Sequence, residues 1–162
     1  MNTSLDMTYL GYLGFLGTNT KSSPLLAHMV AASTFERALR RGLRRQLWSK
    51  LTGTGRSSTL QTLEHQPVIR EATRSNRITS VPLDQIVGSE SRSEDFDSYF
   101  NPLKIHNRER WIGIAIAYRS GVALPPVELV QEGDHFYVRD GHHRISVART
   151  LGQLDIEARI VN

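Results

Sequence analysis

The chain has 162 residues, of which 39% are hydrophobic and 22% charged, a composition typical of a globular domain with a real core. It contains no cysteine, which excludes disulfides, zinc–thiolate sites and thiol nucleophiles and favours a cytoplasmic location. The net charge of +4 is unevenly spread, because residues 34–56 hold seven basic and one acidic side chain, whereas residues 78–162 hold nine basic and twelve acidic. No apolar run is long enough to span a bilayer.

Residues 1–33 predict a poorly ordered leader. A secretory signal is disfavoured, because the start is not basic, Asp6 is charged, and the apolar part is interrupted by Gly11, Gly14 and Gly17. Met29 opens the stretch "MVAASTFERALRR" and would be a natural beginning for the protein, so we hypothesise that translation starts there. Mass spectrometry of the native N-terminus tests this, and a peptide covering Met1 to His28 would refute it.

Residues 34–52 predict a basic amphipathic helix. Ser33 and Glu36 have the spacing of a capping box, and apolar residues recur every fourth position at Phe35, Leu39, Leu43, Leu47 and Leu51. Three interpretations stay open. The helix packs on its own domain with a solvated basic face, it contacts DNA or anionic lipid, or it binds an acidic protein through Arg37–Arg56.

Residues 53–77 predict a linker with a short helix, and from Ile78 onward the pattern changes to that of a small domain. A strand from Ile78 reaches a turn at Pro82 and a short helical turn ending at Ile86, followed by an acidic loop or short helix. The stretch "NRERWIGIAIAYRSG" (107–121) predicts a helix closed by Gly121.

The last part of the chain predicts a hairpin, a helix and a closing strand. The hairpin turns at Glu132-Gly133-Asp134, the helix spans residues 143–152, and the strand spans residues 156–161. The expected fold class is therefore α+β, with residues 78–162 forming a small mixed-sheet domain preceded by the basic amphipathic helix.

The strongest candidates for binding or catalysis lie in "DGHHR" (140–144), where the predicted strand is followed by the predicted helix. The first N–H groups of a helix have no acceptor within it and, with the helix dipole, favour an anion such as phosphate. Gly141 permits close approach of a ligand, Arg144 offers a planar fork of donors, and His142 and His143 can donate hydrogen bonds.

Asp140 leaves three alternatives open. Its carboxylate could hold a histidine or arginine, bind a metal ion that bridges phosphates, or cap the helix. A transition-metal site on His142 and His143 is disfavoured, because the sequence offers no third ligand at a suitable spacing.

The ordered motifs of residues 78–162 resemble the ParB/sulfiredoxin superfamily. The resemblance is carried by "VPLDQIVGSESRSEDFD" (81–97), "RSGVALPPVELV" (119–130) and "YVRDGHHRISVARTLGQLDIEARIV" (137–161). The box at 140–144 is most similar to the Asp-Gly-His-x-Arg of the related free-serine kinases. The resemblance implies the fold of that superfamily and a pocket for a nucleotide's phosphates, formed by Gly141–Arg144 and the loop from Glu90 to Arg92.

Two departures narrow the function that the resemblance implies. Sulfiredoxins use a cysteine where this chain has His142, so reduction of a sulfinic acid is excluded. ParB clamps carry a helix-turn-helix segment after this domain, and this sequence ends at Asn162, which argues against centromere binding.

The preferred interpretation is a domain that binds ATP, CTP or ADP with Mg²⁺ and supports NTP hydrolysis or phosphoryl transfer to a small hydroxyl-bearing substrate. Arg92 and Arg144 would supply positive charge, Glu90 is the first candidate for the base, with Asp95 and Asp97 next, and His143 is a second catalytic candidate. One alternative is a regulatory or DNA-associated module that uses the basic helix. The other is a ParB-like nuclease in which His142 or His143 assists a metal-bound water.

Overall fold

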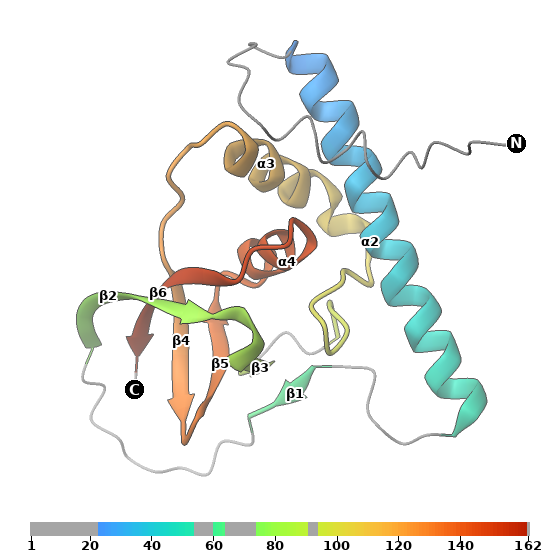
Figure 1. Cartoon of the computed structure of the whole chain (residues 1–162). Helices are drawn as coiled ribbons and strands as arrows, with labels where there is room; N and C mark the ends of the chain where they lie inside the picture. Colours follow the sequence, from blue (N-terminus) through green and yellow to red (C-terminus); the bar gives the residue numbers. More distant parts are fainter. Residues whose placement is uncertain (1–22, 54–59, 64–73, 91–93, 162) are drawn as a thin grey trace, which may run out of the picture.

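A computed structural model describes residues 23–53, 60–63, 74–90 and 94–161 (Figure 1). Its helices are α2 (Pro24–Thr52), α3 (Arg108–Arg119) and α4 (His142–Thr150), with short 3-10 turns η1 (Leu83–Gln85) and η2 (Ile105–Asn107). Its strands are β1 (Gln61–Thr62), β2 (Arg74–Pro82), β3 (Ile86–Ser89), β4 (Val127–Glu132), β5 (His135–Asp140) and β6 (Asp155–Val161).

The strands of the described residues form one mixed sheet in the order β1-β3-β5-β4-β6-β2. β4 and β5 are the predicted antiparallel hairpin, in which Glu132 pairs with His135 across the turn. β3 runs parallel to β5 and β6 runs parallel to β4, whereas β2 is antiparallel to β6. The predicted α+β fold with a mixed sheet is therefore confirmed.

Helix α4 lies between the sheet and the other two helices. Its Ile145 and Ala148 join the core of the sheet, whereas Val147, on another side of the helix, joins a second core made with α2 and α3. Trp111 of α3 donates a hydrogen bond from Nε1 to Ser146 Oγ of α4 at 2.9 Å inside this second core. Helix α4 is thus packed against the sheet on one side and against α2 and α3 on the other.

Helix α2 begins at Pro24, ten residues before the predicted start. Proline suits the first turn of a helix, because its missing N–H would have no acceptor there. Ser33 lies inside the helix, where its hydroxyl donates to the Val30 carbonyl at 2.9 Å, so the predicted capping box was wrong. Residues 1–22, the rest of the predicted leader, lie outside the described residues.

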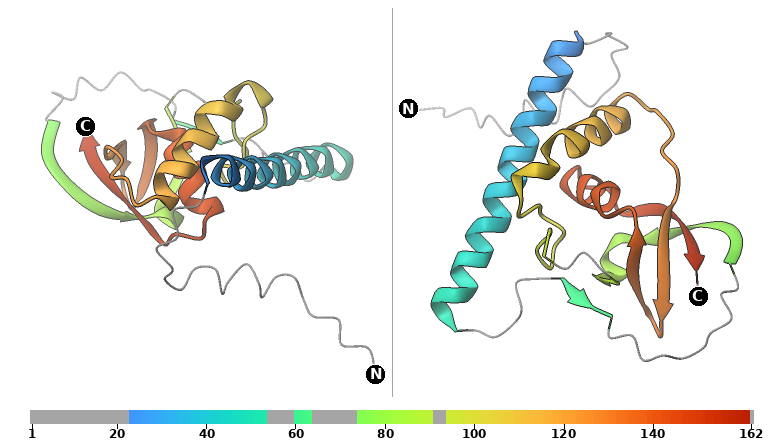
Figure 2. Two further views of the ribbon diagram at one scale, coloured as in Figure 1. Left: turned by 90° about the horizontal axis from the view of Figure 1, so that it is seen from above. Right: turned by 180° about the vertical axis from the view of Figure 1, so that it is seen from behind.

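The first half of α2 packs on the domain alongside α3, as both views in Figure 2 show. Phe35 meets Trp111 edge to face, with ring centroids 5.6 Å apart. Gly42 permits the helix to approach the backbone at Pro102 closely, because a Cβ at residue 42 would lie 2.8 Å from the Pro102 carbonyl oxygen. Packing on the helix's own domain is therefore confirmed for this half.

The second half of α2 faces outward. Beyond Gly42, large apolar side chains of this helix are exposed, namely Leu43, Leu47, Trp48 and Leu51. None of the helices in the described ranges combines the length and apolarity needed to cross a membrane.

The core also crosses the predicted domain boundary at Ile78. Leu60 is 2% exposed and belongs to the core of the sheet, and β1 pairs with β3 at Gly88 and Ser89. β2 starts at Arg74, so its first residues fall in what the sequence suggested was linker. Residues 54–59 and 64–73 of the predicted linker lie outside the described residues.

The loop of residues 94–104 contains a buried aromatic pair. Phe96 and Phe100 are fully buried in the core of the sheet. Asp97 is 1% exposed, and its carboxylate accepts hydrogen bonds from the backbone N–H groups of Tyr99 (2.9 Å) and Asn101 (2.8 Å). Asp97 thus fixes the loop, and a role for it as a catalytic base is not supported by this geometry.

Candidate functional site

The turn between β5 and α4 is built around Gly141. Its φ of 104° lies in the left-handed region, and a Cβ at this position would lie 2.5 Å from Val127 Cγ1 on the adjacent strand. The Gly141 carbonyl accepts the first helical hydrogen bond, from Ile145 N at 3.0 Å. Only glycine can start the helix this close to β4, so the position of α4 over the sheet depends on it.

A hollow of about 100 Å³ opens at the start of α4. It is lined by all five residues of the predicted box, Asp140, Gly141, His142, His143 and Arg144, and by Arg110 and Ile114 of α3. The consecutive residues of the box thus line one hollow together with two residues of α3, a helix to which the sequence analysis assigned no site residue.

Arg144 is used mainly to hold its own surroundings. Its Nη1 donates to the carbonyls of Pro125 and Pro126, the latter at 2.9 Å, and its Nη2 donates to Asp140 Oδ2 at 2.7 Å. These bonds fix the segment before β4 against α4. The predicted open fork of donors is thus partly occupied, although the guanidinium still lines the hollow.

Asp140 does not cap α4, because no side chain makes a capping hydrogen bond to the backbone N–H groups of the first turn. Of the three alternatives open from the sequence, the structure shows the first, in which the carboxylate holds an arginine. The Asp140 side chain is 61% exposed, compared with 12% for Arg144, so the carboxylate is the more accessible member of the pair.

Both histidines are buried, at 4% exposure for His142 and 5% for His143. They contact the same ring, since His142 stacks on Phe96 at 6.1 Å and His143 meets it edge-on at 5.3 Å. The two imidazole rings differ in orientation relative to Phe96, yet both belong to the packed wall of the hollow. In the part of the chain that the structure describes, no group of three His, Asp or Glu side chains is placed to hold a metal ion.

Ser89, at the end of β3, is one residue that the sequence analysis missed. It is fully buried, and its hydroxyl lies 2.6 Å from His142 Nε2. Successive residues of a strand point to opposite faces of the sheet, so Ser89 and Glu90 cannot both face α4. Because Ser89 is paired in register with the buried Val138, that face belongs to Ser89. The alternation of side chains along a strand could have identified Ser89 as the inward-facing residue. The sequence pattern, however, predicts a helical turn and a loop where β3 lies.

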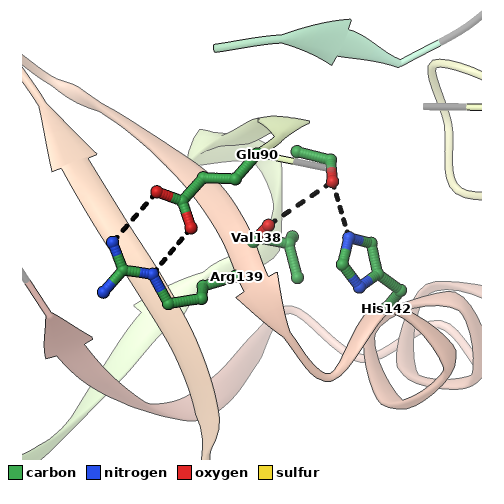
Figure 3. A network of polar contacts seen from close by, with 5 residues as sticks. Glu90, Val138, Arg139 and His142 are labelled. Carbon is green, nitrogen blue, oxygen red and sulfur yellow. Dashed lines mark hydrogen bonds and ion pairs between the residues drawn. The ribbon is translucent and has the colours of Figure 1, made fainter. Parts of the chain in front are cut away.

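Glu90 instead pairs with Arg139 on the outer face of β5. The two oxygens of the carboxylate accept hydrogen bonds from Arg139 Nε at 2.6 Å and Nη2 at 3.0 Å, and Figure 3 shows the carboxylate directed toward Arg139 and away from His142. The hydrogen bond to Glu90 raises the pKa of Arg139, and partial burial opposes this. Glu90 is not among the residues that line the hollow, and its role as a base stays a prediction.

Two other predicted residues lie away from the hollow or cannot be placed. Asp95 forms an ion pair with Lys104 at 3.0 Å, which raises the pKa of Lys104. Arg92 lies outside the described residues. Arg110 was missed because its position in the helix, one residue before the buried Trp111, predicts only a solvated side chain.

Replacing Ser89 tests whether the contact with His142 stabilises the site. Ser89→Ala removes the hydroxyl partner of a buried ring nitrogen, and we expect the free energy of unfolding to fall by about 1–3 kcal/mol. Urea denaturation measures this, with the exposed Ser33→Ala as control, which should change stability by less than about 0.5 kcal/mol. Equal stability of the two variants would contradict a structural role for the Ser89–His142 pair.

Comparison with known proteins adds little beyond this geometry. No protein-family profile and no curated protein matches the chain. Among solved structures, a sulfiredoxin from Arabidopsis thaliana is similar, with 20% sequence identity and a TM-score of 0.38 over 52% of this chain and 83% of the sulfiredoxin. A likeness this distant assigns no activity, so the function has to be argued from the site.

Proposed function

We propose that this protein binds the phosphate groups of a nucleotide at the hollow where α4 begins. The observation that carries the proposal is the convergence of the Asp140–Arg144 box with Arg110 of α3 around one opening at a helix N-terminus. The N-terminal end of a helix carries about half an elementary positive charge and presents N–H groups that lack acceptors within the helix.

The charges around the hollow favour an anion. Arg110 and Arg144 line it, against the single carboxylate of Asp140, which Arg144 already neutralises. Arg110 is exposed and makes no ion pair or hydrogen bond with the described residues, so its guanidinium is available to a ligand. The positive end of the α4 dipole adds to both arginines.

The size of the hollow suits part of a nucleotide. Sites that enclose a whole drug-sized ligand measure about 300–1,000 Å³, whereas this one measures about 100 Å³, enough for a phosphate end. The sugar and base of ATP, CTP or ADP would therefore lie outside it. A magnesium ion carried by the phosphates would meet Asp140, the exposed carboxylate at the rim.

Hydrolysis or transfer of the terminal phosphoryl group is the chemistry that such a site could support, because this reaction depends chiefly on positioned charge. Of the two predicted catalytic residues, His143 lines the hollow and Glu90 does not. Phosphate release from ATP and CTP, followed in the wild type and in His143→Ala, separates a catalytic protein from one that only binds.

Arg110 gives the sharpest test of binding. Arg110→Ala removes one charged donor from the hollow without touching the core, and we expect the Kd for the preferred nucleotide to rise roughly ten- to a hundredfold. Calorimetric titration with ATP, ADP and CTP, with and without magnesium, measures this. The control is Arg119→Ala, an equal charge change at the far end of α3.

Two results would defeat the proposal. One is the absence of binding by all three nucleotides at millimolar concentration. The other is an equal loss of affinity in Arg110→Ala and Arg119→Ala, which would mean that net charge and not the hollow attracts the ligand.

A further inference from the structure

A second hollow, of about 200 Å³, lies at the opposite end of α4. It is lined by Arg41 and Arg45 of α2, by Tyr99 and Asn101 of the loop after β3, and by Arg149 and Thr150 at the end of α4. Three arginines therefore line one opening, and no carboxylate is among its lining residues. A cluster of basic residues without acidic neighbours in its lining favours an anion as the ligand.

Arg149 is the fixed member of the three. Its Nη2 donates to the backbone carbonyls of Leu83 and Ile86, the latter at 2.8 Å, and its Nε is buried without a hydrogen-bond partner among the described residues. Burial lowers the pKa of Arg149, and attraction to Asp84 and Asp97 opposes this only in part. The chain thus holds a partly buried cation that its own acidic groups compensate incompletely.

The acidic side chain of the loop that attracts Arg149 is Asp97, and it is already engaged. Asp97 accepts hydrogen bonds from the backbone and side chain of Asn101, the latter at 2.9 Å. The two arginines from α2 remain accessible. Arg45 lies over the Tyr99 ring at 3.7 Å, and Arg41 makes no ion pair or hydrogen bond with the described residues.

We propose that this second hollow, formed by Arg41, Arg45 and Arg149, is a binding site for a phosphate-bearing anion. Guanidinium groups bind phosphate oxygens through paired N–H donors, and several of them together match a group that carries more than one negative charge. At about 200 Å³ the hollow is smaller than the roughly 300–1,000 Å³ of sites for whole nucleotides. One or two phosphate groups fit this size better.

The phosphate could come from a free anion or from a lipid headgroup. A lipid source is considered because the second half of α2, which carries Arg45, also carries exposed apolar side chains. Leu43, Leu47, Trp48 and Leu51 are exposed there. Exposed Leu and Trp side chains on an arginine-rich helix are a feature of helices that bind the surface of an anionic membrane. A second copy of the chain is a poorer occupant, because two equally basic surfaces would face each other.

The first experiment uses pyrophosphate and the full chain, observed by backbone amide NMR. The amides of Asn101 and Thr150 report this hollow, and those of residues 142–144 report the hollow at the start of α4. We expect saturable shifts at Asn101 and Thr150, and a rise in Kd of about tenfold or more in the Arg41→Gln/Arg45→Gln variant. Shifts at residues 142–144 without shifts at Asn101 and Thr150 would contradict this proposal and leave the nucleotide site at the start of α4 unaffected. Shifts at Asn101 and Thr150 alone would support this proposal and count against the nucleotide site.

The matched control is Arg40→Gln/Arg44→Gln, which removes the same charge from exposed positions of the same helix that do not line the hollow. This control should keep the shifts and the affinity within about twofold of the wild type, because rim charges contribute little. An equal loss in both double variants would overturn the proposal, as would the absence of shifts at Asn101 and Thr150.

The second experiment separates the two sources by sedimentation with vesicles of phosphatidylcholine, with and without phosphatidic acid. A lipid source predicts binding only to the vesicles with phosphatidic acid, lost both in Arg41→Gln/Arg45→Gln and in Leu47→Ser/Trp48→Ser. A free-anion source predicts pyrophosphate shifts without sedimentation, unchanged in Leu47→Ser/Trp48→Ser. If neither pyrophosphate nor phosphatidic acid binds through Arg41 and Arg45, the hollow is not a phosphate site.

Discussion

Gly141→Ala is expected to lower the free energy of unfolding by about 2–5 kcal/mol, although it adds a single methyl group. Two costs combine at this position. The φ of 104° lies where an L side chain is strained, and the new Cβ would lie 2.5 Å from Val127 Cγ1 and 2.8 Å from Val127 Cβ. Relief requires the start of α4 to move away from β4, which would also disturb the hollow.

Gly121→Ala is the control, because Gly121 also has a positive φ, of 68°, but its added Cβ would meet nothing within 4 Å. It should therefore show the backbone strain alone, about 1–2 kcal/mol. Urea denaturation of both variants measures the difference. Similar losses for the two glycines would show that the close approach of Gly141 to Val127 does not constrain the turn.

Phe35→Ala is expected to destabilise the whole protein by about 3–5 kcal/mol. Phe35 is fully buried against Trp111, and Trp111 is in turn hydrogen-bonded to Ser146 of α4. Loss of the ring leaves a cavity between α2 and the domain. Thermal or urea unfolding followed by tryptophan fluorescence should show one cooperative transition at a lower midpoint.

The control lies on the same helix, where Leu47→Ala changes an exposed side chain and should shift stability by no more than about 0.5 kcal/mol. If Phe35→Ala and Leu47→Ala had equal effects, α2 would be an appendage and not part of the fold.

Local signals were enough to predict the helices and strands that follow residue 107. The Gly133 turn between alternating strands predicts the β4–β5 hairpin, and the apolar spacing that ends at Gly121 predicts α3. These patterns depend on neighbours in sequence, which is why they can be recognised without coordinates. The box at residues 140–144 is recognisable for the same reason.

What the sequence did not reveal depends on contacts between distant segments. The burial of Phe96 and Phe100 is decided by packing under the sheet, and their loop had appeared polar and acidic. The choice of Glu90 over Ser89 followed from missing β3, since the face to which each side chain points is fixed only by pairing with β5. Arg110 joins the site because α3 crosses near the start of α4.

Each end of α4 carries one of the two candidate anion-binding hollows. One end combines a glycine turn, the box and Arg110 around a helix N-terminus. The other gathers three arginines around a larger hollow. Binding a nucleotide's phosphates at the first end is the central claim, and the anion site at the second is argued on separate residues.

The most direct measurement of the central claim is a titration of the labelled wild-type protein with ATP and magnesium, observed at the backbone amides of His142, His143 and Arg144. We expect large, saturable shifts at these three amides and a matching rise in Kd in Arg110→Ala. Amides that stay unshifted at millimolar ATP, CTP and ADP would contradict it.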